Sequence, residues 1–299
     1  MARSLPLLSD APDANAASGS LRLGVAGRGD LRWAVVDLTG PVEALRARLD
    51  LSPTAAVALG RSMVASALLL RFSTKMAGRL RFEVLGDGPL GRIYAETDSG
   101  GKVRGTVEHP HFPGFEPGIL EVGRAVGSGM LRVTQEFDGR RLPHVSQTEL
   151  VDGEVGNDLV HFLFQSQQVQ SAALLSVLPG ASGVAAAGGL LVEAFPQAAE
   201  STVGALESNI GALQPIGELL RRGGDDELLT AVLGGLDHEE LESYPLYYGC
   251  VCSRDGLLER LRTLPESDLL ELGNEEGEAV IECSYCLGET VFSISELLN

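Results

Sequence analysis

The spacing of apolar and polar residues changes several times along the chain, and the first changes predict a strand and two helices. Residues 30–38 alternate as a strand, and helices follow at 39–50 and 51–72. Pro41 and Pro53 stand in the first turn of these helices, where a missing N–H costs least. The second helix is apolar nearly all round, so we expect it to be buried in the core.

The middle of the chain is dominated by strand patterns. Residues 78–108 predict three antiparallel strands joined by the turns GDGPLG and DSGG, and two more strands are expected at 129–137 and 142–150. Residues 155–172 have helical periodicity, and a pair of strands is predicted at 173–195. Strands and helices that occur in blocks, without regular alternation, are typical of an α+β fold with a largely antiparallel sheet and packed helices.

The uncharged run 171–192 approaches the length of a membrane-spanning helix. Pro179-Gly180 and the glycines that follow would break a lipid-exposed helix. We therefore interpret this run as two buried strands and a turn, and expect no membrane partner.

Between residues 199 and 245 the pattern changes to short amphipathic pieces interrupted by glycine and proline. Two apolar stripes are formed, the first by Leu206, Ile210, Leu213, Ile216, Leu219 and Leu220 and the second by Leu228, Leu229 and Val232. Neither piece is long enough to be a stable helix alone in water, so each needs a surface on which to dock. The segment is interpreted as a helical linker; the alternative is the last helical part of the main domain.

Charge is distributed unevenly over the 299 residues, which are enough for two domains. The formal net charge is −18, and residues 221–299 contribute −13 of it, from 18 acidic residues and 5 arginines. This acidity argues against nucleic acid as a partner, because phosphate binding needs clustered basic residues. Residues 1–20 lack the apolar stretch of a secretory signal and are expected to be a disordered tail.

All four cysteines lie in the last fifty residues, as the C-x-C pair Cys250 and Cys252 and the C-x-x-C pair Cys283 and Cys286. Four thiolates complete the tetrahedral shell that Zn²⁺ prefers, and a closed shell leaves no position for a reactive water. One structural zinc ion is therefore predicted. Residues 246–299 are too few and too acidic to fold well unaided, whereas structural zinc supplies about 10–16 kcal/mol in zinc-finger peptides. Oxidation of either pair would remove two ligands and should unfold this domain.

Other candidate sites are weak. GDGPLG, residues 86–91, has the spacing of a dinucleotide-binding loop, but a strand rather than a helix follows it, so a hairpin turn is expected. His109 and His111 flank a proline without a nearby third ligand and are interpreted as loop residues. The sequence offers no nucleophile and base in a recognisable arrangement, so no catalytic residue is predicted.

The chain resembles the redox-regulated heat shock protein 33 chaperones from about residue 21 to residue 299. The cysteine signature carries the resemblance in YYGCVCS and ECSYCLGETVFSISEL, and the main domain carries it in LSPTAAVALGRSMVASALLL, RLRFEVLGDGPLGRIYAE and DLVHFLFQSQQVQSAALLSV. Gln167 and Leu51 depart from residues common in the family, Glu and His. Neither departure affects the cysteines.

The resemblance implies a cytoplasmic, ATP-independent holdase rather than an enzyme. In the family the reduced, zinc-bound form is inactive, and oxidation pairs Cys250 with Cys252 and Cys283 with Cys286. Zinc is then released, the linker unfolds, and the protein dimerises and binds unfolding client proteins under oxidative stress. The expected organisation is a tail at 1–20, a chaperone core at 21–198, the linker at 199–245 and the zinc-binding switch at 246–299.

Two other functions remain open from the residues themselves. Two cysteine pairs also occur in zinc-containing adaptor modules, although the acidic charge disfavours one that binds nucleic acid. A thiol–disulfide oxidoreductase built on Cys283 and Cys286 would require a neighbouring βαβ unit. Short strands are predicted there instead.

Overall fold

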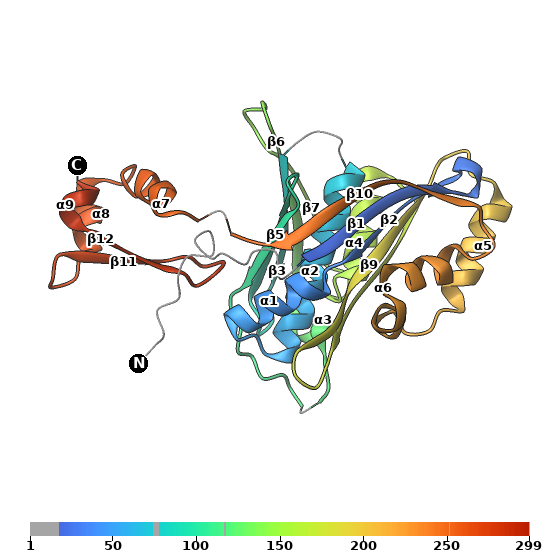
Figure 1. Cartoon of the computed structure of the whole chain (residues 1–299), viewed down its shortest axis with the longest axis horizontal. Coiled ribbons are helices and arrows are strands. Elements are labelled where there is room, and N and C mark those ends of the chain that lie inside the picture. Colours follow the sequence, from blue (N-terminus) through green and yellow to red (C-terminus); the bar gives the residue numbers. More distant parts are fainter. Residues whose placement is uncertain (1–17, 74–77, 117, 251, 299) are drawn as a thin grey trace. The chain divides into compact units, whose positions relative to one another are not determined.

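The computed structural model describes residues 18–73, 78–116, 118–250 and 252–298 (Figure 1). These residues form two compact units, one ending at Tyr248 and the other beginning at Gly249. The first contains a large sheet with its helices, and the second contains the four cysteines. The α+β class is confirmed.

A ten-stranded sheet forms the first unit, in the order β7-β6-β3-β4-β5-β10-β1-β2-β9-β8. Every neighbouring pair is antiparallel except β5 with β10, which pair in parallel over two residues. The strands are β1 (Ser18–Ala26), β2 (Leu31–Asp37), β3 (Gly78–Gly86), β4 (Arg92–Asp98), β5 (Lys102–Val107), β6 (Gly129–Phe137), β7 (His144–Glu149), β8 (Ser171–Pro179), β9 (Val184–Ala194) and β10 (His238–Tyr248).

Helix α2 (Pro53–Ser73) is the centre of the core. Its side chains pack on one face of the sheet, beside α1 (Thr39–Leu49) and α3 (Val122–Val126). A Cβ at Gly60 would lie 2.7 Å from Val177 and 2.9 Å from Val42, so only glycine allows this close approach. Among the described helices, α2 alone is long and apolar enough to span a membrane, but 89% of its apolar segment is buried inside the fold.

Two helices, α5 (Glu200–Gly211) and α6 (Ile216–Leu233), cover the opposite face of β2 and β9. Leucines on both helices share one apolar cluster with Trp33, Leu190 and Val192 of the sheet. The cluster contains every residue of the two predicted stripes, with Ile210, Leu213 and Ile216 partly buried. The stripes dock on a surface, as predicted.

Helix α6 is kinked at Gly223 and Gly224, and Gly224 has a backbone conformation (φ 64°, ψ −151°) that only glycine adopts readily. The acidic residues just after the kink bind Arg22 of β1: its guanidinium lies 3.3 Å from Asp225 and 2.6 Å from Asp226. Glu240 of β10 lies 2.7 Å from the same group. Charge therefore adds to apolar contact in holding this segment on the sheet.

Three expectations from the sequence were wrong. Residues 238–245, expected to be helical, belong to β10, which pairs with β1 along its length. The helix expected over 155–172 is shorter: α4 (Gly156–Phe162) continues as a π-helical turn, η3 (Leu163–Gln167), and β8 begins at Ser171. Residues 18–20, placed in the tail, belong to β1. The rest of that tail, 1–17, lies outside the described residues.

The second unit is small. A hairpin of β11 (Glu278–Glu282) and β12 (Glu289–Ser293) packs with α7 (Arg254–Leu261), α8 (Glu266–Glu271) and α9 (Ile294–Leu297). Its main apolar cluster is built on Leu269, Ala279, Phe292 and Leu297. The cysteines form a separate buried cluster, so the apolar core of this unit is small for its length.

Candidate metal centre

Each cysteine pair is held by a tight local structure. Cys283 and Cys286 lie in the turn that joins β11 to β12, where the amide of Cys286 donates to the carbonyl of Cys283 at 3.2 Å. Cys252 directly precedes Ser253, whose hydroxyl caps α7 by accepting the amide of Gly256 at 3.1 Å. The turn holds the backbone at Cys283 and Cys286, and the cap holds the backbone that follows Cys252. A metal site needs its ligand residues oriented by the surrounding structure in this way.

The fold brings the four sulfurs together. All lie within 4.8 Å of one another, and sulfur–sulfur contacts between the two motifs join Cys250 to Cys283 at 3.6 Å and Cys252 to Cys286 at 3.4 Å. A tetrahedral zinc site with Zn–S bonds of about 2.3 Å has sulfurs about 3.8 Å apart. A disulfide, by contrast, needs about 2.05 Å. The arrangement is that of four thiols around the position of one ion.

The four thiols differ slightly in how deeply they are buried. Cys250, Cys252 and Cys286 are buried and Cys283 is partly exposed. Hydrogen bonds with the other thiols, Cys252 first, lower the pKa of Cys250, whereas hydrogen bonds with the other thiols, Cys250 first, raise the pKa of Cys252. At Cys283 the contact with Cys250 raises the pKa, but those with Cys252 and Cys286 outweigh it and leave a value of about 6. Four thiols this close ionise as a group, and a cation would favour the charged form of all.

The other sequence candidates lie elsewhere. GDGPLG is the turn between β3 and β4, so the hairpin interpretation is confirmed. His111 lies in a loop with Nδ1 3.0 Å from the carbonyl oxygen of Asp50. Within the described ranges, the cysteines are the one group of three or more His, Cys, Asp or Glu residues arranged to hold a metal ion.

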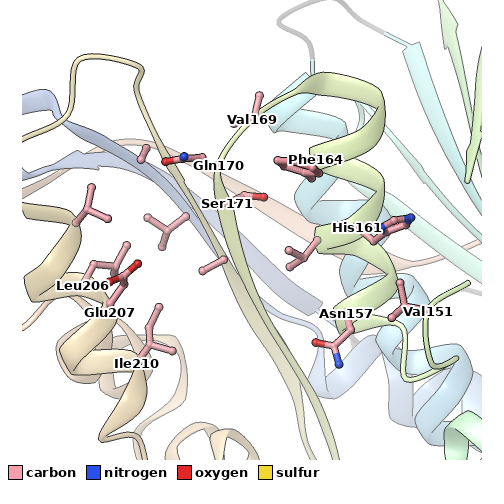
Figure 2. A pocket seen from close by; sticks show the side chains of 15 residues that line it. Val151, Asn157, His161, Phe164, Val169, Gln170, Ser171, Leu206, Glu207 and Ile210 are labelled. Carbon is pink, nitrogen blue, oxygen red and sulfur yellow. The ribbon is translucent and has the colours of Figure 1, made fainter. Parts of the chain in front are cut away.

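Sequence reasoning did not find a groove beside the edge strand β8. It is lined by residues of α4, β8, β9 and α5, and it has a volume of about 630 Å³. Its members are dispersed from Val151 to Ile210 and share no spacing in the sequence. The helix expected over 155–172 also included Ser171 and Ala172, which are the first residues of β8 and line the groove (Figure 2).

Comparisons with known proteins agree with one another. The family model described as Hsp33 protein matches residues 20–293. The 33 kDa chaperonin of a Thermus thermophilus strain is 38% identical over 90% of this chain and 82% of its own length. That of Trichormus variabilis is 41% identical over 87% of this chain and 88% of its own length.

A solved structure gives the same result. The crystal structure of the 33 kDa chaperonin (heat shock protein 33 homolog) from Thermotoga maritima matches with a TM-score of 0.83 and 31% sequence identity. The match covers 93% of this chain and 96% of that one. By family model, by sequence and by structure, this chain belongs to the Hsp33 family.

Proposed function

We propose that the protein is a redox-regulated, ATP-independent holdase, in which Cys250, Cys252, Cys283 and Cys286 hold one zinc ion in the inactive form. The sulfur cluster carries this proposal, since four thiolates within 4.8 Å suit a structural zinc ion that would stabilise the small second unit. Its partners are unfolding proteins. The oxidised homodimer and the cytoplasmic setting rest on family membership alone.

Activation begins with thiol oxidation. Two thiols of one motif and one peroxide molecule give a disulfide and two water molecules, which removes two ligands from the site. The proposed pairs are Cys250 with Cys252 and Cys283 with Cys286. Pairing within each motif closes only small rings, so it leaves the two motifs unconnected. The second unit, with its small apolar cluster, would then unfold.

The linker supplies the connection between oxidation and client binding. Strand β10 ends at Tyr248, two residues before Cys250, so the switch and the segment that covers the sheet are covalently continuous. Release of α5 and α6 would expose the apolar face formed by Trp33, Leu190 and Val192. Exposed apolar surface of this kind binds other unfolded chains, and the net charge of −18 keeps the opened protein in solution.

The test divides one preparation into a reduced, zinc-loaded half and a half oxidised with peroxide at mild heat. Zinc content, thiols, helicity and suppression of client aggregation are measured on both. Trp33 is the one tryptophan and is 1% exposed under the linker, so its emission reports release of the linker. We expect one zinc ion, four thiols and no activity in the reduced half. Equal suppression of aggregation by the two halves would refute regulation by oxidation.

Disulfide mapping tests the pairing. Sulfur contacts of 3.6 Å and 3.4 Å join the two motifs, Cys250 with Cys283 and Cys252 with Cys286. Disulfides across these contacts would hold the motifs together, as a bound metal does, and would contradict the unfolding step. Peptide masses should instead give pairs within each motif.

A further inference from the structure

Two parts of the linker are held on the sheet in different ways. Helix α6 docks through the apolar cluster that it shares with α5 and the sheet. Strand β10 pairs with the backbone of β1, and within the described residues it contributes no side chain to that cluster. The cluster therefore does not join α6 to β10, although β10 is the part of the linker that continues into the switch.

The guanidinium of Arg22, on β1, binds both of these parts. Its Nε and Nη2 atoms lie 2.8 Å and 2.7 Å from one carboxylate oxygen of Glu240 on β10. Its Nη1 atom lies 2.6 Å from Asp226 and 3.3 Å from Asp225 on α6. Arginine suits this position because the donors of its planar guanidinium point in fixed and different directions. One side chain of the sheet thus bridges two elements of the linker.

This bridge has an excess of negative charge. Three carboxylates surround one guanidinium, which gives a formal net charge of −2. The side chains of Arg22 and Asp225 are only 22% and 18% exposed, so solvent screens their charges only in part. Loss of the guanidinium would leave the carboxylates of α6 and β10 unpaired and repelling one another. Removing one partner of such a group is costly because the remaining charges are uncompensated.

We propose that Arg22 couples the switch to the linker helices by holding α6 and β10 on the sheet together. Its side chain is ordered once for two contacts, so the conformational entropy cost of ordering it is shared. When oxidation unfolds the switch and β10 leaves, Arg22 loses Glu240 and is exposed to water, and its hold on α6 weakens. The proposal rests on the proposed function for the event that starts the release, and it adds the residue that transmits it.

The first experiment measures hydrogen exchange over 216–233 and 238–245 in the reduced, zinc-loaded full chain. Arg22→Met keeps an unbranched apolar side chain but removes the charge, and both segments should exchange about tenfold faster. Arg221→Met is the control, because Arg221 pairs with Glu218 of its own helix at 2.7 Å, and it should leave both rates unchanged. Wild-type exchange of either segment in Arg22→Met would overturn the proposal.

A combined variant separates the charge of Arg22 from the packing of its side chain. Asp225→Asn, Asp226→Asn and Glu240→Gln together remove the carboxylates that repel one another when the guanidinium is absent. Added to Arg22→Met, they should slow exchange again, to within about threefold of the wild-type rate. If the combined variant exchanges as fast as Arg22→Met alone, charge is not what Arg22 contributes, and the proposal fails.

A substitution on β10 tests whether release passes from one element to the other. Glu240→Gln leaves Arg22 with α6 alone, so exchange over 216–233 should become about threefold faster although the substitution lies outside α6. Glu239→Gln, at the exposed neighbouring residue of β10, should not change it. Slower exchange in Glu240→Gln would mean that repulsion among the carboxylates outweighs the shared ordering of Arg22, and it would refute the coupling.

The peroxide dose for half-maximal suppression of client aggregation separates this proposal from the proposed function. Arg22→Met should reach it at about a third of the wild-type dose, with one zinc ion still bound in the reduced protein. Faster exchange with an unchanged dose would refute a role of Arg22 in regulation. If neither oxidised protein suppresses aggregation, the holdase function fails, whereas the exchange rates still decide whether Arg22 holds both elements.

Discussion

At the scale of single residues, Asp158 holds the loop 151–155 through hydrogen bonds to its backbone amides. This loop has no apolar periodicity in the sequence. The side chain of Asp158 is 1% exposed and accepts the amides of Val151 at 2.7 Å and Val155 at 2.9 Å, with Asp152 and Gly153 at longer range. These bonds hold Val155 at φ 69°, which is unfavourable for a β-branched residue. The carboxylate therefore compensates for backbone strain at the start of α4.

Asp158→Asn should destabilise the first unit, because the amide keeps the shape but directs a donor at donors. Hydrogen bonds to a charged group contribute about 1.5–3 kcal/mol each, and we expect a loss of at least about 2 kcal/mol. Urea unfolding followed by Trp33 emission measures it. Glu149→Gln, on an exposed position of β7, is the control and should change stability by less than about 0.5 kcal/mol. Similar effects of the two substitutions would refute the role of Asp158.

Glu193 gives a second residue-scale prediction, which concerns pH. Burial raises its pKa in the folded protein above the ordinary 4.5, so from that pH upward the unfolded chain releases a proton that the folded one retains. Stability contributed by this group is therefore complete below 4.5 and falls as pH rises towards the folded pKa. Glu193→Gln should become progressively more stable relative to the unsubstituted protein between pH 4 and pH 7. A constant difference between the two urea midpoints would contradict this.

At the scale of elements, the linker helices contain two glycines whose replacement by alanine should have opposite effects on docking. Gly224 in α6 has a conformation that alanine adopts only with strain, whereas Gly204 lies in regular α5 with open space around it. Gly224→Ala should weaken docking, although helix propensity alone predicts stabilisation. Gly204→Ala should strengthen α5 by up to about 1 kcal/mol.

Hydrogen exchange over 200–233 and the peroxide dose for half-maximal activity measure both changes. Gly224→Ala should exchange faster and become active at a lower dose, and Gly204→Ala should behave in the opposite way. If both variants shift in the same direction, the kink is not a constraint on the docked linker.

Helices and strands were predicted correctly from the sequence where their apolar residues form a long and clear pattern. Helix α2 and the hairpin of β8 and β9 have long apolar patterns because they are buried, and they were predicted. Strand β10 was missed because its residues His238–Pro245 are almost all exposed, so its side chains have no alternation. Its position is fixed by backbone pairing with β1, and backbone hydrogen bonds leave little trace in side-chain type.

At the scale of the whole molecule, the two units differ in what stabilises them. The first has a continuous apolar core around α2, and the second has one small apolar cluster beside four cysteines. Removal of the proposed zinc ion with a chelator under reducing conditions should unfold the second unit, because the binding free energy of a structural metal is part of the folding free energy.

Circular dichroism and proteolysis after chelation test this difference. Cleavage should concentrate beyond Gly249 while residues 18–198 stay protected, and added zinc should restore the fold. Cys286→Ser, at a fully buried position of the proposed zinc site, should reproduce the effect without chelator. A second unit that remains resistant to protease without metal would show that its apolar cluster is sufficient.

The sequence by itself determined the clustering of the four thiols and the need of the amphipathic segment for docking. Thiol spacing and short amphipathic stripes are local properties, and Cys250, Cys252, Cys283, Cys286 and the linker leucines were identified from them. Tertiary structure alone decided the pairing of β10 with β1, the contacts between the two cysteine motifs, and the unpaired oxygen of Glu193. These features depend on which distant segments meet, and residue type at one position does not encode that.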